Sequence, residues 1–278
     1  MRLANGVCLA IACALISCQD SAYAPWPREI VPGTVRRYPC KRTESPPKLD
    51  GMLDEQSWNT APWSEPFVDI EGGDKPTPRY TTRMKMLWDN DNLYIAADLE
   101  EPDLWGTYDK HDMVVFHEHD FEVFIDPDGN KESYYELEFN VIGTIFDLYL
   151  DREYRLGGTA HHEWNCDGIK GAITKLGSAN NSTDTDTGWR IEIQIPFSSL
   201  RPPSTVTNDG PENIRNGDTP AIGEQWRMNF SRVEWQLEKV GTGYVKKPGT
   251  QADNWVWTPQ WAVDMHRLDH WGQVLFTK

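Results

Sequence analysis

Basic side chains are scarce in this 278-residue chain. Its 27 lysines and arginines face 43 aspartates and glutamates, which gives a formal net charge of −16 at pH 7. Proteins that bind nucleic acids need clustered positive charge, because they displace the counterions of the phosphate backbone. The acidic balance therefore argues against a nucleic-acid partner and is typical of a soluble protein that avoids anionic partners.

Long hydrophobic runs are also lacking, apart from residues 7–16. This run is shorter than the roughly 20 residues of a membrane-spanning helix, but it has the length of a signal-peptide core. It ends in Leu-Ile-Ser-Cys, which resembles the lipobox of bacterial lipoproteins. We therefore predict a lipoprotein signal peptide over 1–17 and lipid attachment at Cys18. The protein would be exported and lipid-anchored in the cell envelope, in the outer membrane or facing the periplasm. The alternative is an ordinary secretory signal that is cut after Ala22 or Ala24.

Cysteine is rare beyond the N-terminus. Three of the five cysteines lie within the first 18 residues, which leaves Cys40 and Cys166. A pair of cysteines in an oxidising compartment indicates a disulfide. Closing a loop of this length would contribute roughly 4–5 kcal/mol by the chain-entropy estimate. The alternative is two unpaired buried thiols.

No long segment repeats apolar residues at the helical period of 3.6. Four segments instead alternate apolar and polar residues, which is typical of half-buried antiparallel strands: 92–100, 134–141, 190–196 and 226–232. A single helical turn is expected at 196–200. The predicted fold class is all-β, an antiparallel two-sheet β-sandwich over residues 46–278 that follows a tether and lead-in segment at 18–45. The unpatterned stretches 202–222 and 238–254 are expected to be surface loops.

The sequence lacks the G-x-S-x-G elbow, the P-loop and the dinucleotide fingerprint. Residues 112–130, DMVVFHEHDFEVFIDPDGN, are the best candidate for a metal site. Residues 117–119 (His-Glu-His) would put two imidazoles on one side of an extended strand, but no later histidine completes the set. An EF-hand loop that starts at Asp126 fails, because Lys131 replaces its glycine and Leu137 its glutamate. A structural calcium held by loop carboxylates is the better metal prediction, with its ligands unassigned.

Aromatic residues are abundant, with 13 tryptophans and 10 tyrosines. Trp226 alternates with Met228 and Phe230 and is expected in the core. Trp105 and Trp261 lie in or beside loops, where an exposed ring costs solubility unless it is covered or used. Sugar rings have apolar C–H faces and polar edges, so an aromatic platform flanked by acids matches both.

Five stretches, in order, resemble carbohydrate-binding module family 9, in particular the free-standing family 9-like lipoproteins of polysaccharide-degrading bacteria. They are PPKLDGMLDEQSW (46–58), MKMLWDNDNLYIAADLEEPD (84–103), DFEVFIDPDGN (120–130), GWRIEIQIPFSSL (188–200) and HWGQVLF (270–276). The resemblance implies a β-sandwich, calcium ions and non-catalytic glycan binding. In xylanase-linked members of the family it also implies an aromatic clamp on a terminal sugar.

The resemblance further implies site positions. One clamp tryptophan lies six residues before the strand glutamate, which is Glu122, so that its place is taken by Phe116. The other lies six residues before Trp271, at Met265. The position of a sugar-contacting arginine is held by Glu138.

Residues beside these positions complete the predicted site. His117 and Glu118 adjoin the first clamp position and could bind sugar hydroxyls, and two tryptophans could replace the missing platforms. The predicted carbohydrate-binding residues are Trp105, Phe116, His117, Glu118, Glu122, Glu138, Trp261 and Met265.

Three hypotheses on function follow. The first is non-catalytic carbohydrate binding by an exported, monomeric lipoprotein that supports polysaccharide capture or catabolism, with a glycan ligand and a membrane contact through its lipid. The second is a hydrolase of glycosidic bonds that uses carboxylates among Glu118, Glu122, Glu136 and Glu138. The third is a sandwich module without affinity for sugars.

Overall fold

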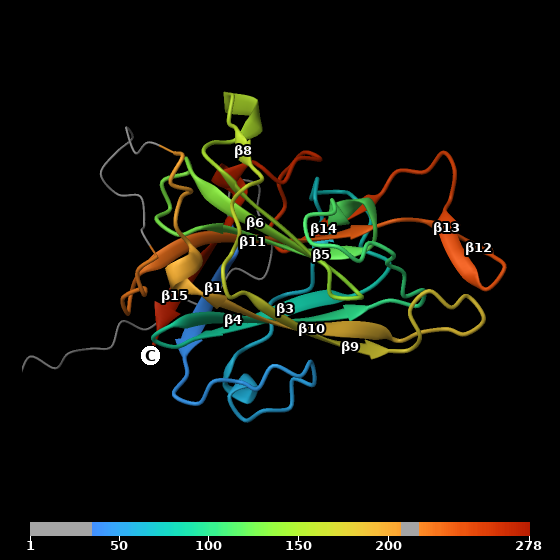
Figure 1. The fold of residues 1–278 in the computed structure, drawn as a ribbon, viewed down its shortest axis with the longest axis horizontal. Coiled ribbons are helices and arrows are strands. Elements are labelled where there is room, and N and C mark those ends of the chain that lie inside the picture. Colours follow the sequence, from blue (N-terminus) through green and yellow to red (C-terminus); the bar gives the residue numbers. More distant parts are fainter. Residues whose placement is uncertain (1–34, 207–216) are drawn as a thin grey trace, which may run out of the picture.

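The computed structural model describes residues 35–206 and 217–278, so the predicted signal peptide and Cys18 lie outside the described residues. The strands are β1 (Arg37–Arg42), β2 (Val68–Asp69), β3 (Thr82–Trp88), β4 (Asn92–Glu100), β5 (Asp120–Asp126), β6 (Tyr134–Asn140), β7 (Ile145–Leu150), β8 (Ala160–His161), β9 (Lys170–Leu176), β10 (Gly188–Pro196), β11 (Gln225–Glu234), β12 (Leu237–Val240), β13 (Gly243–Lys246), β14 (Asp253–Val256) and β15 (Gly272–Thr277). Short 3-10 helices are η1 (Trp58–Thr60), η2 (Val115–His117), η3 (Tyr154–Leu156), η4 (Phe197–Ser199) and η5 (Leu268–His270). Figure 1 shows this all-β arrangement.

The alternating segments form the strands that the sequence predicts. They correspond to β4, β6, β10 and β11, and the expected helical turn is η4. The prediction of loops at 238–254 is wrong, because β12 and β13 form a hairpin there. That hairpin has mostly exposed side chains, so its sequence carries no apolar alternation. Among the described residues, no helix is both long enough and apolar enough to cross a bilayer.

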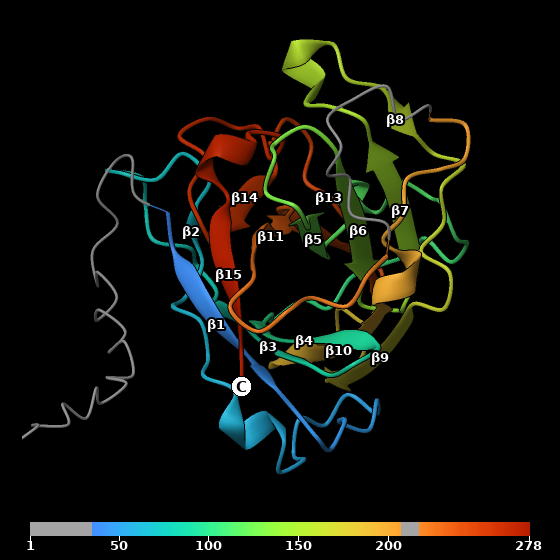
Figure 2. The same cartoon turned by 90° about the vertical axis from the view of Figure 1, so that its left-hand side faces the viewer.

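The prediction of two separate antiparallel sheets is wrong. Across the described residues, one 13-stranded sheet runs in the order β8-β7-β6-β5-β11-β15-β1-β3-β4-β10-β9. The two remaining strands extend it from β11, where β14 pairs with β11 and β2 pairs with β14. β1 pairs in parallel with both β15 and β3, so it links the two halves of the sheet. Figure 2 shows the sheet curling around the core, with β1 at the turn between the halves. Alternation reports which face of a strand is buried, and it does not identify the neighbouring strand.

The main core fills the inside of the curl. Side chains from both halves meet there, including Ile95, Ile193, Phe121 and Phe230. The sheet begins before residue 46, where the sequence prediction placed it, because Tyr38 of β1 is buried in this core.

Two smaller clusters cover the outer faces of the sheet. One is centred on Phe124, Tyr134 and Trp271 and lies over β5 and β6 beneath the loops that carry η2 and η5. The other packs Trp58 of η1 against Leu87 of β3 and Tyr94 of β4. Other parts of the chain therefore cover the outer faces of the sheet, so polar groups on these faces can be held away from water.

The predicted disulfide is wrong for this structure. Cys40 and Cys166 are both free and buried. Cys40 lies on β1, whose neighbours are β15 and β3, whereas the N–H of Cys166 is held by Asp147 of β7 at 2.7 Å. A count of cysteines establishes that a pair is available, but a disulfide also requires matched Cα spacing and side-chain direction.

Candidate functional site

A row of polar side chains crosses three neighbouring strands on the outer face of the sheet. Glu122 of β5 stands opposite Ser231 of β11 on one side and Glu138 of β6 on the other. Phe121 and Val123, which flank Glu122 in sequence, point into the main core. Because successive side chains of a strand alternate between faces, the row lies on the opposite face, under the loops.

Two further acids lie on the same face. Asp120 precedes Glu122 by two residues, and Glu136 precedes Glu138 by two. Oxygens of Asp120, Glu122 and Glu138 lie within 4.8 Å of one another. We call these four residues the carboxylate floor, and all four are buried.

Burial makes the charged form of these acids costly. It raises the pKa of Glu122 to about 7 and, together with the charge of Glu122, raises the pKa of Glu136 to about 8. The pKa values of Asp120 and Glu138 are also raised well above the usual range, first by burial and then by the charge of Glu122. No lysine or arginine among residues 35–206 and 217–278 forms an ion pair with the floor. Like charges at this spacing require a proton, a cation or a ligand.

Hydrogen bonds from the backbone and among its own members hold the floor. One oxygen of Asp120 accepts the N–H of Val233 at 2.9 Å, and one oxygen of Glu138 accepts the N–H of Phe116 at 2.8 Å. Glu122 also forms side-chain hydrogen bonds with Ser231 and with Asp120, and these bonds partly offset the effect of burial on its pKa. A hydrogen bond between two carboxyl groups needs a proton on one of them, so protons can balance part of the charge of the floor.

One wall beside the floor is η2. Its Phe116 is 40% exposed although its backbone is bonded to Glu138. The ring of Phe116 lies 4.6 Å from that of His117, which is also exposed. Val115 anchors the turn by packing into the outer cluster. The sequence therefore presents an aromatic ring next to the carboxylates from a short, well-fixed helix.

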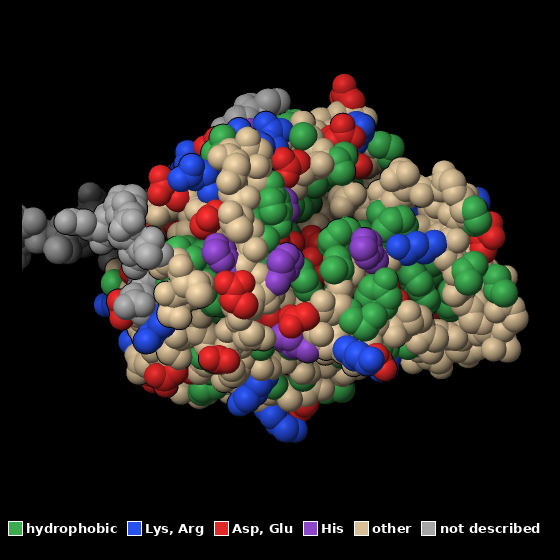
Figure 3. Space-filling view, turned by 45° about the horizontal axis from the view of Figure 1, so that its top comes forward, with side chains coloured by type: hydrophobic (Ala, Val, Ile, Leu, Met, Phe, Trp, Pro, Cys, Tyr) green, Lys and Arg blue, Asp and Glu red, His purple; other side chains and the backbone are tan. Residues whose placement is uncertain are grey.

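A second wall comes from η3 and from the loop before η5. Tyr154 is 46% exposed, and its ring meets that of His266 edge-on at 4.6 Å. Burial, with Glu136 and Glu138 nearby, raises the pKa of Tyr154 to about 12. His266 Nδ1 is hydrogen-bonded to the Tyr134 hydroxyl at 2.8 Å. Figure 3 looks toward this side of the molecule, where histidine and hydrophobic side chains surround a hollow in which acidic side chains are visible.

The structure brings three predicted site residues together, Phe116, Glu122 and Glu138. Met265 lies near the second wall, 8% exposed in the outer cluster, and its carbonyl accepts the Trp271 indole N–H at 2.8 Å.

The other predicted residues serve elsewhere. Glu118 turns away from the floor and accepts the N–H groups of Thr107 and Tyr108. Trp105 is 7% exposed and packs edge-on against His119, so it is no open platform. The ring of Trp261 packs over Gly72, where an added Cβ would come within 3.0 Å of it.

Sequence reasoning missed Tyr154, His266 and Ser231 as site residues. The sequence does indicate the position of Ser231. It follows the core residue Phe230, so its side chain is expected on the opposite, outer face of the strand. Tyr154 and His266 lie in segments without a period, and only the fold places them together.

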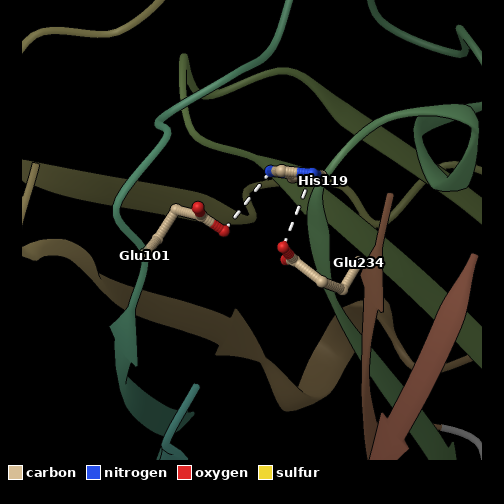
Figure 4. Close-up of side chains that lie close together, drawn as sticks. All are labelled: Glu101, His119 and Glu234. Carbon is tan, nitrogen blue, oxygen red and sulfur yellow. Dashed lines mark ion pairs between the residues drawn. The ribbon is translucent and has the colours of Figure 1, made fainter. Parts of the chain in front are cut away.

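The imidazoles of His117 and His119 do not lie on one side of an extended strand. η2 ends at His117, which breaks the extended geometry, and His117 is exposed while His119 is buried. Figure 4 shows His119 between Glu101 and Glu234 instead. Burial raises the pKa of Glu101 to about 7.

This second acidic group contains its own cation. The Arg232 guanidinium lies 2.6 Å from Glu101 and 2.9 Å from Glu234. The guanidinium offsets part of the charge of the two carboxylates, and the network joins β11 to the residues that follow β4 and precede β5.

The acidic turn after β5 is held by hydrogen bonds to its own carboxylates. Asp126 accepts the N–H groups of Gly129 and Lys131 at 2.9 and 3.1 Å, and Asp128 accepts both the backbone and the amide N–H of Asn130. These bonds fix the conformation of the turn.

A curled all-β domain with a cleft on its outer face defines the class of protein. Within that class, the family model described as "Carbohydrate family 9 binding domain-like" matches residues 49–230, and the chain belongs to this family.

Curated relatives that match this chain carry the names of enzymes and are much longer. The chain is 33% identical to endo-1,4-beta-xylanase A of Thermotoga maritima over 181 residues, which is 64% of this chain and 14% of the relative. It is 29% identical to exoglucanase XynX of Acetivibrio thermocellus over 154 residues, 55% of this chain and 12% of the relative. The chain thus spans a small part of the length of the relatives that it matches.

Solved structures share the fold. A family 9 carbohydrate-binding module from Caldicellulosiruptor kristjanssonii, in complex with cellotriose, aligns with a TM-score of 0.56 over 87% of this chain and 94% of that chain. A candidate carbohydrate-binding protein from Bacteroides uniformis aligns with a TM-score of 0.59 over 87% and 100%. Both are 14% identical to this chain, so the likeness shows the fold alone.

Proposed function

We propose that this chain binds a glycan without cleaving it, through the cleft between η2 and the Tyr154–His266 wall. The observation that carries the proposal is the placement of Phe116, whose exposed ring is fixed beside the carboxylate floor. Family membership and a fold neighbour that holds cellotriose support it.

The chemistry of the cleft suits a sugar. The rings of Phe116 and Tyr154 offer apolar faces for the C–H groups of a pyranose. The carboxylates below can accept hydroxyl hydrogens, and charge-assisted bonds of this kind are stronger than neutral ones. Most binding sites combine such apolar walls with a few placed polar groups.

The proposal extends to the location of the protein. The N-terminal sequence supports export and lipid attachment at Cys18, so that a monomeric domain would present its cleft at the cell envelope and assist polysaccharide capture or catabolism. In Cys18→Ala the anchor is absent, and the protein should leave the membrane fraction. Retention of that variant on salt-washed membranes would contradict the anchor without touching the sugar proposal.

Calorimetric titration with cellotriose, glucose and xylo-oligosaccharides tests the function, with a reducing-sugar assay on the same mixtures. We expect saturable binding of at least one sugar and no new reducing ends. New reducing ends that disappear in Glu122→Gln would establish the hydrolase alternative. If the protein binds nothing on a broad glycan array, the domain is a module without affinity for sugars.

A further inference from the structure

Trp235 extends the cleft beyond Phe116. It directly follows β11, and its carbonyl oxygen accepts a hydrogen bond from Nε2 of His119 at 3.0 Å, just before β5 begins. The Tyr154–His266 wall stands nearer the other end of β5, where the ring of His266 meets that of Phe124. Aromatic side chains therefore lie toward both ends of the floor, and the proposed sugar cleft uses only one end.

Hydrogen bonds fix Trp235 and Phe116 relative to each other. The indole N–H of Trp235 donates to the carbonyl of Phe116 at 3.1 Å, and the N–H of Phe116 donates to Glu138 at 2.8 Å. Together with the bond from His119, they form an unbroken series from a buried imidazole through both aromatic residues to the floor. Groups that are already fixed lose little conformational freedom when a ligand binds.

The indole ring of Trp235 is supported from one face only. The ammonium group of Lys246 on β13 lies 3.5 Å from the centre of the ring, in a cation–π contact. Trp235 is half-buried, and it packs against none of the three hydrophobic clusters of the described residues. Figure 3 shows hydrophobic side chains between the hollow and the projecting side of the molecule, where Figure 1 places β12 and β13. The face of the ring opposite Lys246 is therefore available to a ligand.

We propose that Trp235, supported by Lys246, forms a second sugar subsite next to Phe116, so that the protein binds a chain of sugar units rather than a single unit. This inference rests on the proposed function and adds the length of the ligand to it. One pyranose stacks on Phe116 above the floor, and the next unit of the chain stacks on Trp235. The acidic floor and the formal net charge of −16 repel anionic sugars, so the units are neutral.

Calorimetric titrations with glucose and cellotriose, and with xylose and xylotriose, measure what the second subsite adds. We expect the wild type to bind at least one trisaccharide about tenfold or more tightly than the matching monosaccharide. Trp235→Ala should abolish most of this difference, because truncating an aromatic contact has effects of this size. The same variant should leave the affinity for the monosaccharide unchanged, since the first subsite keeps Phe116.

Two further variants separate stacking from a structural role. Trp235→Phe loses the N–H that bonds to Phe116 but keeps a ring, so it should retain most of the preference for the trisaccharide. Val245→Ala changes an exposed side chain on the face of β13 opposite that of Lys246, because side chains alternate along a strand. It should leave both affinities as in the wild type, and melting curves of all variants show whether the fold is intact.

Three results would overturn the second subsite. If Trp235→Ala and Trp235→Phe weaken the binding of both sugars of a pair equally, Trp235 serves only to position Phe116. If the wild type binds a monosaccharide and its trisaccharide with the same affinity, the chain has a single subsite, and the proposed function stands without the second. If the wild type binds none of the four sugars, both proposals fail.

Discussion

The indole N–H of Trp58 donates to Glu192 Oε1 at 2.6 Å, across 134 residues of sequence. The other carboxylate oxygen of Glu192 accepts the N–H groups of Asp50 and Gly51 at 2.9 and 2.6 Å. One buried acid on β10 therefore fixes the whole segment 46–58 to the outer face of the second half of the sheet. The two family-like stretches joined in this way, 46–58 and 188–200, therefore maintain the fold. The cleft lies on the other half of the sheet.

Replacing this acid should destabilise the protein. Glu192→Ala removes the acceptor for three N–H groups, and a buried unpaired donor costs about 1–3 kcal/mol. We expect the free energy of unfolding to fall by about 3 kcal/mol or more, measured by urea denaturation. The exposed Glu44→Ala should change it by less than about 0.5 kcal/mol. Equal stability of the two variants would show that Glu192 does not hold the segment.

The sequence predicted which segments form strands better than it predicted which strands pair. Alternation located β4 and β10 because each residue reports its own face. The parallel pairing of β1 with β15 could not be predicted from the sequence, since it joins segments from opposite ends of the described chain. The family resemblance implied that Phe116 lies beside Glu122, and only a short turn separates the two in the chain. Tyr154 and His266 could not be paired, because a long loop region brings them together.

The two thiols should behave as inert core residues. Cys40 and Cys166 are buried, and burial raises the pKa of both well above the usual range. The thiolate is the reactive form, so neither should be alkylated in the native protein, and both should react fully after unfolding without a reductant. Non-reducing peptide mapping that links the two residues would contradict the structure.

His266 should make stability depend on pH. Burial lowers its pKa from 6.5 to about 4, and Asp264 offsets this only in part. Between these values the unfolded chain binds one more proton than the folded chain, so this contribution is complete above about pH 6.5 and is lost as the pH falls toward 4.

The matching variant is His266→Asn, which keeps a polar group near the Tyr134 hydroxyl but cannot titrate in this range. Urea denaturation at about pH 5 and about pH 7.5 should give a smaller loss of stability at the lower pH than in the wild type. The exposed His162→Asn should retain the loss found in the wild type. An unchanged pH dependence in His266→Asn would mean that this imidazole is protonated in the folded state.

The cleft walls should carry most of the sugar affinity. Polar contacts largely exchange hydrogen bonds with water for hydrogen bonds with protein, whereas stacking on an exposed ring removes apolar surface from water. For a sugar that binds the wild type, Phe116→Ala or Tyr154→Ala should therefore weaken binding by about 2 kcal/mol, the size of an aromatic hot spot. Glu122→Gln should weaken it less, because the amide keeps one acceptor and the side-chain shape.

The control for the walls is an aromatic residue elsewhere in the domain. Trp63 packs against Arg83 and Lys85 of β3, on the half of the sheet that lacks the carboxylate floor, so Trp63→Ala should leave sugar affinity unchanged. Melting curves of all four variants separate lost binding from lost structure. If Phe116→Ala and Tyr154→Ala both fold and bind normally while Trp63→Ala does not, the sugar lies on the opposite half of the sheet. The cleft beside the floor would then hold no glycan.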